Sequence, residues 1–355
     1  MLYKLRDIFD LQMGKTPSRD NNMYWKDGNL PWVSISDLSK SQIYIENSKE
    51  LITKFAVKDT LVKCIPKDTV IMSFKLSLGK TAITRKPLYT NEAIMAFIDK
   101  KVIQIEPKYI YFLFSYIQWG QFTNNAVKGK TLNKKFFSDF QINIPKYTQQ
   151  TKVSSILIRI NKILEYKRSL IEIYDALIKS RFDELFLNTH SIETMEIGEL
   201  FEVGSSKRIL QSELTTYGIP FYRVTDLINR INDRPVDIKQ YVDELKYMTL
   251  IKEKYVPQAG DFLITARGTI GKIYEVKQND KFYFQDGMIT WLKRKNNYIN
   301  NLFFMELVKT DWFRRQFYSS NNGTTISYLS ITDTRHLKVL LPALNLQLQF
   351  AQEVY

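Results

Sequence analysis

The chain has 355 residues, of which 44% are hydrophobic, so it is long enough for two folded domains and too apolar for general disorder. Its 51 lysines and arginines exceed its 37 aspartates and glutamates, and the charge of +14 together with 14% aromatic residues favours a polyanionic partner. The single cysteine, Cys64, excludes an intrachain disulfide, and with only His190 and His336 it cannot complete a Cys/His zinc site.

No segment is typical of secretion or of a membrane anchor. The first ten residues, MLYKLRDIFD, carry charges where a signal peptide is apolar. The longest apolar run, residues 109–119, has about 11 residues, whereas a membrane span needs roughly 18. We therefore expect a cytoplasmic protein without a membrane segment.

The first half of the chain is repeated in the second half. Residues 5–10 (LRDIFD) recur as residues 197–202 (IGELFE), an offset of 192 residues. Residues 30–38 (LPWVSISDL) are echoed by residues 219–227 (IPFYRVTDL), and both predict a strand that ends in a turn of hydroxyl and acidic residues. Because the order of the blocks is kept while the offset drifts, we expect one fold in both halves, with different surface loops.

A second pair of matching blocks predicts a strand, a polar loop, a glycine and a lysine at residues 66–80 and again at residues 257–272. The end of the first loop, Gly79 to Thr81, resembles a nucleotide-binding loop, but Phe74 occupies the position that requires glycine. The loops are better interpreted as tight turns that present basic and hydroxyl side chains, with a generic hairpin turn as the alternative. A last pair, residues 128–131 and 322–325, precedes extended segments that end at Pro145 and Pro342.

Residues 148–186 contain neither glycine nor proline and predict one helix, roughly 58 Å long at about 1.5 Å per residue. Apolar residues recur at intervals of seven over about five heptads, which is typical of a coiled coil. Charged residues occupy the opposite face, as expected for a solvated surface. The predicted seam, which we expect to form a subunit interface, contains Leu157, Ile160, Leu164, Ile171, Tyr174, Ile178 and Leu185.

Residues 343–355 predict the beginning of a second helix. Pro342 and Gln347 repeat the spacing of Pro145 and Gln150 at the entry of the first helix. Only 13 residues follow Pro342, so we expect this helix to be cut short. The seam of the first helix would then be available to another copy of the chain or to a partner helix.

Basic and hydroxyl residues gather in loops at corresponding places of the two halves. Lysines chiefly neutralise phosphates, whereas arginine and asparagine can also bond to base edges. Any one of these lysines alone is more simply interpreted as a solvated surface charge; the prediction rests on three loop clusters that recur. The candidate DNA-binding residues are Lys15, Thr16, Arg19, Lys75, Ser77, Lys80, Lys128, Lys130 and Lys134 in the first half, and Lys207, Arg208, Arg223, Arg267, Thr269, Lys272, Asn322, Thr324 and Thr325 in the second.

Motifs for catalysis are not recognisable. A two-metal nuclease would need paired carboxylates and a lysine at a strand end, and none are convincing. An adenine methyltransferase would need a glycine-rich cofactor loop and an adenine-clamping Asn/Asp-Pro-Pro-aromatic loop, and we find neither. A catalytic role for His190 or His336 has no serine or cysteine relay to support it.

The chain resembles the specificity subunit of type I restriction-modification enzymes over essentially its whole length. The resemblance is carried by the two diverged halves, by the PxxxQQxK entry at Pro145, by the heptad stretch, and by its exit through residues 177–186 (LIKSRFDELF). The loop 266–271 (ARGTIG) and the tail from Pro342 to Gln347 are also similar to the family. In the first half, Lys75 replaces the arginine of that loop.

The resemblance implies an α+β fold, in which two similar α/β-mixed target recognition domains are joined by a long coiled-coil-type helix and the second conserved helix is truncated. The expected boundaries are residues 1–147 and 188–342 for the recognition domains, 148–187 for the helix and 343–355 for the truncated helix. Each recognition domain would read one half of a bipartite double-stranded DNA target. The helix length corresponds to roughly 17 base pairs at ~3.4 Å each, which is enough to hold the two domains more than one turn of DNA apart.

The resemblance also implies that the chain does no chemistry and binds no cofactor. Methyltransferase subunits would use S-adenosylmethionine, and restriction subunits would use ATP and Mg²⁺. Self-association through the exposed seam is a further expectation. Two alternatives stay open from the residues alone: a protein-binding adaptor that acts through the coiled coil, and a diverged autonomous nuclease or DNA methyltransferase.

Overall fold

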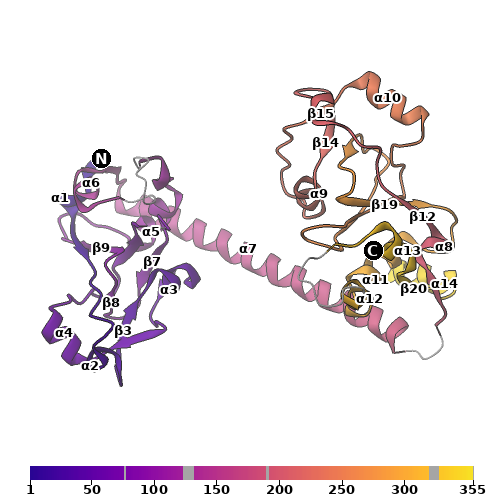
Figure 1. Cartoon of the computed structure of the whole chain (residues 1–355). Helices are drawn as coiled ribbons and strands as arrows, with labels where there is room; N and C mark the ends of the chain where they lie inside the picture. The colour runs from indigo at the N-terminus through magenta and orange to yellow at the C-terminus, as the bar shows by residue number, and fades with distance from the viewer. Residues whose placement is uncertain (76, 123–131, 189–191, 320–327, 355) are drawn as a thin grey trace. The chain divides into compact units, whose positions relative to one another are not determined.

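The computed structural model describes residues 1–75, 77–122, 132–188, 192–319 and 328–354. The chain divides into two compact units, Met1–Arg168 and Ser169–Tyr355, and the division falls within the long helix α7 (Figure 1). Lys128, Lys130, His190, Asn322, Thr324 and Thr325 lie outside the described residues.

Unit 1 is a mixed α/β structure built around a five-stranded sheet of order β2-β9-β6-β7-β4, with a three-stranded sheet β5-β3-β8 and the pair β1-β10. Its elements are β1 (Leu2–Lys4), α1 (Leu5–Ile8), β2 (Phe9–Met13), α2 (Asn22–Trp25), β3 (Leu30–Val33), α3 (Ile35–Lys40), β4 (Tyr44–Ile45), β5 (Glu50–Ile52), α4 (Lys54–Thr60), β6 (Val70–Ser73), β7 (Thr81–Thr84), β8 (Tyr89–Thr90), β9 (Ile94–Asp99), α5 (Pro107–Tyr116), the 3₁₀ helix η1 (Trp119–Phe122), α6 (Lys134–Asp139), β10 (Gln141–Asn143) and α7 (Tyr147–Phe182).

Unit 2 repeats this plan with a four-stranded sheet β12-β19-β16-β17, a second sheet β13-β15-β14-β18 and the pair β11-β20. Its elements are the π-helical turn η2 (Asp183–Leu187), β11 (Thr194–Glu196), α8 (Ile197–Leu200), β12 (Phe201–Gly204), the 3₁₀ helix η3 (Gln211–Glu213), β13 (Leu214–Thr215), β14 (Ile219–Tyr222), α9 (Val224–Ile231), β15 (Tyr241–Val242), α10 (Glu244–Lys252), β16 (Phe262–Thr265), β17 (Ile273–Glu275), β18 (Tyr283–Phe284), β19 (Ile289–Arg294), α11 (Asn301–Lys309), α12 (Asp311–Ser319), α13 (Ile331–His336), β20 (Lys338–Leu340) and α14 (Leu344–Val354).

The strand pairing shows that the duplication extends to topology. β2 pairs antiparallel with β9 and β12 with β19; β6 lies between β7 and β9 as β16 lies between β17 and β19. In each unit a short strand also pairs in parallel with a strand far along the chain. These pairs are β3 with β8 in unit 1 and β14 with β18 in unit 2. The predicted fold class, two similar α/β-mixed domains joined by a long helix, is confirmed.

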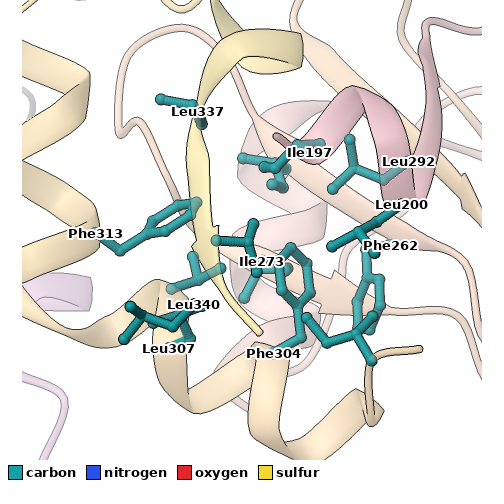
Figure 2. Close-up of a cluster of buried hydrophobic side chains, with 14 of the residues drawn as sticks. Ile197, Leu200, Phe262, Ile273, Leu292, Phe304, Leu307, Phe313, Leu337 and Leu340 are labelled. Atoms are coloured by element: carbon teal, nitrogen blue, oxygen red, sulfur yellow. The ribbon is translucent and has the colours of Figure 1, made fainter. Parts of the chain in front are cut away.

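The core of each unit forms where the sheet is covered by its helices. The central strands β6 and β16 are buried along their whole length, which explains their nearly continuous apolar sequences. In unit 2, Leu200 of α8 and Phe304 of α11 lie beside Phe262 and Leu292 of the sheet, and Phe313 of α12 lies on the opposite side of the same cluster (Figure 2).

The structure defines two local predictions more closely. The predicted turns of hydroxyl and acidic residues after β3 and β14 are the first turns of α3 and α9, where Asp37 and Asp226 accept backbone N–H bonds at the N-termini of these helices. The predicted helix to residue 186 is an α-helix only to Phe182 and continues as a π-helical turn, Asp183–Leu187. Phe182 and Phe186, four residues apart on one face, enter the same core.

Candidate nucleic-acid interface

Three polar loops of unit 1 meet at one end of its main sheet. The segment after β2 is bonded to the end of β8, where the β8–β9 connection begins, through the Lys15 N–H and the Thr90 carbonyl at 2.9 Å. The β6–β7 loop reaches the same connection through the Phe74 N–H and the Ala93 carbonyl, also at 2.9 Å. The Leu132 N–H donates to the Phe74 carbonyl at 3.0 Å, which places the start of α6, with the exposed Lys134, beside them.

Glu92 lies among the predicted basic residues of these loops and was not predicted from the sequence. The Thr16 hydroxyl donates to its carboxylate. Burial opposes ionisation of Glu92, but this hydrogen bond, a backbone N–H and the charges of Lys75 and Arg19 together hold its pKa below the usual value. The structure thus brings Thr16, Arg19 and Lys75 together around one carboxylate.

Arg19 is already engaged within the unit. Its guanidinium forms an ion pair with Glu50, and the hydrogen bond to that carboxylate raises the pKa of Arg19. The same guanidinium lies 4.0 Å from the ring centroid of Trp25 and 4.9 Å from that of Trp32. Its position therefore has a structural explanation in addition to the predicted contact with DNA.

The β6–β7 loop presents Lys75, Ser77 and Lys80. Ser77 and Lys80 are exposed and Lys75 is half-buried, with its ammonium 5.5 Å from the Phe74 ring centroid. Gly79 has a φ of +80°, and a Cβ there would lie 2.7 Å from the ring of Trp119. Glycine is therefore required for the turn that carries these side chains.

Unit 2 arranges its corresponding loops in the same way. The Ala266 N–H donates to Met288 and the Leu329 N–H donates to Ala266, at 2.9 and 3.0 Å, as Phe74 bonds in unit 1. Arg267 is exposed in the first part of the β16–β17 loop, where its backbone forms a β-bridge with Tyr328, and its guanidinium lies 4.2 Å from the ring centroid of Tyr328. Thr269 is exposed and Lys272 is half-buried in the same loop.

The remaining described candidates of unit 2 are Lys207 and Arg208, which follow β12, and Arg223, which precedes α9. Lys207 forms an ion pair with Glu253 at 2.7 Å, and this hydrogen bond raises the pKa of the lysine. Arg208 is exposed next to it. The Arg223 guanidinium donates to the Gln240 side chain at 2.5 Å. Among the described residues, no hydrogen bond or ion pair joins the Arg223 side chain to the β16–β17 loop.

The predicted seam of α7 differs along its length. Ile160, Leu164, Ile171 and Tyr174 are 46%, 47%, 60% and 57% exposed. Leu157 is half-buried and lines an open groove together with Tyr109 and Val153. Ile178 and Leu185 pack against the core of unit 2. Among the residues of the predicted seam, the exposed ones thus lie in the middle of the helix.

A sequence model of the type I restriction modification DNA specificity domain matches residues 1–173 and 190–352. The chain belongs to this family. Among its relatives, the MjaIX specificity subunit of Methanocaldococcus jannaschii is 25% identical over 370 residues, covering 96% of this chain and 82% of the relative. The EcoR124I/EcoR124II specificity subunit of Escherichia coli is 28% identical over 153 residues, 41% of this chain and 36% of the relative.

Solved structures share the fold. The type I restriction-modification S subunit from M. genitalium superposes with a TM-score of 0.56 at 16% identity, over 100% of this chain and 88% of the other. A chain from a structure on assembly and conformational transition of the type I R-M system gives a TM-score of 0.57 at 13% identity, with the same coverage. The resemblance predicted from the sequence is therefore confirmed.

As a type I specificity subunit, the chain is a non-catalytic DNA-recognition component, which answers the alternative of an autonomous enzyme. Specificity subunits are generally free of cofactors. In the described part of the chain, no group of three or more His, Cys, Asp or Glu residues could hold a metal ion. Nor is any helix of the described residues long and apolar enough to cross a membrane.

Sequence reasoning missed the residues that orient the predicted ones. Glu92, Glu50 and Glu253 are acidic and distant in sequence from the basic residues they contact, so no local pattern identifies them. The aromatic partners of Arg19 are likewise separated from it along the chain. Only the coincidence of an acidic residue in both β8–β9 and β18–β19 turns, Glu92 and Asp286, offered a signal.

Proposed function

We propose that each unit of this specificity subunit contacts one part of a bipartite double-stranded DNA target with the loops at the end of its main sheet. The recognition domains would be residues 1–147 and 188–342, with residues 148–187 as the spacer and residues 343–355 as the start of a second conserved helix. The observation that supports this is that the hydrogen bonds at the base of the β6–β7 loop recur at the base of the β16–β17 loop, in two units with different loop side chains.

Within each surface, the proposed roles differ by side chain. Exposed lysines such as Lys80 and Lys134 would neutralise phosphates, whereas Arg267 has the bidentate geometry for a guanine edge. Its contact with Tyr328 limits its rotation, which favours a directed contact over a mobile charge. The other predicted DNA-binding residues remain candidates for phosphate or sugar contacts.

Salt dependence of DNA binding tests the proposal. If six or more phosphates are neutralised, the slope of log affinity against log salt concentration should be about −5 or steeper. A slope near zero would instead indicate a protein-binding adaptor. The exposed apolar residues of α7 are the observation that favours this alternative. The measurement is a fluorescence-anisotropy titration of the full chain with a labelled duplex at several salt concentrations.

We further propose that the exposed middle of the α7 seam, with the adjoining groove of unit 1, binds an apolar helix of a partner subunit. Unit 2 supports this, because Phe303 on α11 and Phe350 on α14 enclose Phe182 there, with ring centroids 5.3 and 5.4 Å away. At the corresponding places of unit 1, Tyr109 and Val153 line an open groove.

The partners in this proposal are methyltransferase subunits, which would use S-adenosylmethionine, and restriction subunits, which would use ATP and Mg²⁺. The chain itself would hold none of these cofactors. A second copy of the chain is the alternative occupant of the seam, and gel filtration of the isolated chain separates the two, because self-association doubles the apparent mass without any partner.

A further inference from the structure

Two buried hydroxyl groups close the β6–β7 and β16–β17 loops in the same way. The Thr265 hydroxyl donates to the Thr269 carbonyl and accepts a hydrogen bond from the Lys272 N–H at 3.0 Å. In unit 1 the Ser73 hydroxyl donates to the Ser77 carbonyl and accepts from the Lys80 N–H, also at 3.0 Å.

The backbone around each hydroxyl is equally matched. The Thr265 N–H donates to the Lys272 carbonyl and its carbonyl accepts from the Gly271 N–H, both at 2.9 Å. Ser73 makes the same two bonds with Lys80 and Gly79, at the same distance. Both hydroxyl residues are completely buried, although the loops that they close carry exposed residues, Ser77 and Lys80 in unit 1 and Arg267 and Thr269 in unit 2.

Only a hydroxyl side chain can make both bonds at once, because it offers one donor and two acceptor lone pairs on a single short stem. A valine at position 265 has nearly the shape of threonine but would leave the Lys272 N–H and the Thr269 carbonyl without their partner. These groups are near the surface and can bond to water instead. The expected result is a loop that opens locally while the sheet remains folded.

The residues held by the hydroxyls are those that we propose to contact DNA. Arg267 and Thr269 lie inside the loop closed by Thr265, and Lys75 and Ser77 lie inside the loop closed by Ser73. The base of each loop is fixed to the β8–β9 or β18–β19 connection, at Phe74 and Ala266. The hydroxyl therefore controls the tip, where ordering before binding lowers the entropic cost of a specific contact.

We infer that Ser73 and Thr265 are positioning residues, which hold the two DNA-contacting loops in their binding conformation and so determine sequence-specific affinity without touching DNA. This inference rests on the proposed function. It separates two properties of the protein: discrimination between sequences depends on the hydroxyls, whereas salt-dependent attraction to any duplex depends on exposed lysines.

The test compares Thr265→Val, Thr265→Ser and Ser73→Ala in the full chain, with duplexes carrying the mapped target, an altered first part or an altered second part. Thr265→Val should weaken binding to the target roughly 5- to 30-fold, the loss of one or two net hydrogen bonds. Affinity for an unrelated duplex and the salt slope should stay within about twofold of wild type. Thr265→Ser keeps the hydroxyl and should restore target affinity.

The two units serve as controls for each other. Thr265→Val should reduce discrimination at one part of the target roughly 5- to 30-fold and leave the other part fully discriminated, and Ser73→Ala should do the reverse. An equal loss on target and unrelated DNA, full retention of discrimination by Thr265→Val, or failure of Thr265→Ser to restore it would overturn the inference. A wild-type chain without any sequence preference would instead overturn the proposed function itself.

Discussion

The basic side chains of the proposed DNA-binding surface fall into two groups, according to what they already contact. Arg19 and Lys207 are held by Glu50 and Glu253, so binding a phosphate would require them to exchange a partner. Arg267 is exposed; its backbone forms a β-bridge with Tyr328, and the described contact of its guanidinium is with the Tyr328 ring. A guanidinium on an aromatic face keeps its donors available.

Replacing Arg267 should therefore affect sequence recognition more than replacing Arg19 or Lys207. Arg267→Ala is expected to cost about 1–3 kcal/mol in binding to the target and to relax specificity at one base pair. Arg315→Ala removes an exposed arginine of α12 in the same unit and serves as the control. Equal losses for both variants in a binding titration would show that only net charge matters.

Gly271 permits the sharp turn of the loop in unit 2. Its φ is +75°, and an added Cβ would lie 2.3 Å from the Phe317 ring, so Gly271→Ala should destabilise the fold by at least about 2 kcal/mol. Gly204→Ala adds the same methyl group where no atom lies within 4 Å, and should change stability by less than about 0.5 kcal/mol. Denaturant unfolding measures both; a neutral Gly271→Ala would contradict the packing described here.

At the scale of elements, a buried glutamine joins each helix entry to its unit. Gln347 donates to the carbonyls of Tyr298 and Pro342 at 3.0 and 2.8 Å and accepts from the Asn300 N–H at 2.7 Å. Gln150 makes the same three bonds at the entry of α7. The sequence showed the repeated spacing after proline, but not that the amide side chain turns inward.

Gln347→Leu should destabilise unit 2 by about 1–3 kcal/mol, because it leaves buried carbonyl and N–H groups unpaired. Gln349→Leu, on the same helix, removes only an exposed hydrogen bond to Glu353 and should have little effect on the free energy of unfolding. Chemical denaturation followed by fluorescence compares the two. Similar stabilities would mean that the three bonds of Gln347 contribute nothing net.

The exposed middle of α7 should matter for assembly and not for folding. Leu164→Asp and Ile171→Asp change side chains that are 47% and 60% exposed, so each unit should remain folded. Burial of the new carboxylate in an interface would be costly, and complex formation with methyltransferase subunits should weaken. Gel filtration of the mixed subunits measures this, with Lys167→Asp on the polar face as control. Undiminished complex formation by both seam variants would refute the proposed interface.

At the scale of the whole molecule, the duplicated plan and the continuous helix could be predicted because each leaves a local pattern in the sequence. Apolar strands, glycine turns and heptads are visible within a few residues. The parallel pairing of β3 with β8, the ion pair of Arg19 with Glu50 and the hydroxyl closure by Thr265 could not, because they join segments or atoms that no periodicity connects. The sequence therefore located the candidate loops but not the contacts that orient them.

The central claim is that the two units read separate parts of one target. It is tested most directly by mapping methylated sites in cells that carry the partner subunits with either the wild-type chain or a chimera. In the chimera, residues 1–147 are replaced by those of a relative with a different target. We predict that one part of the methylated sequence changes and the other is retained. A change in both parts, or in neither, would contradict the account.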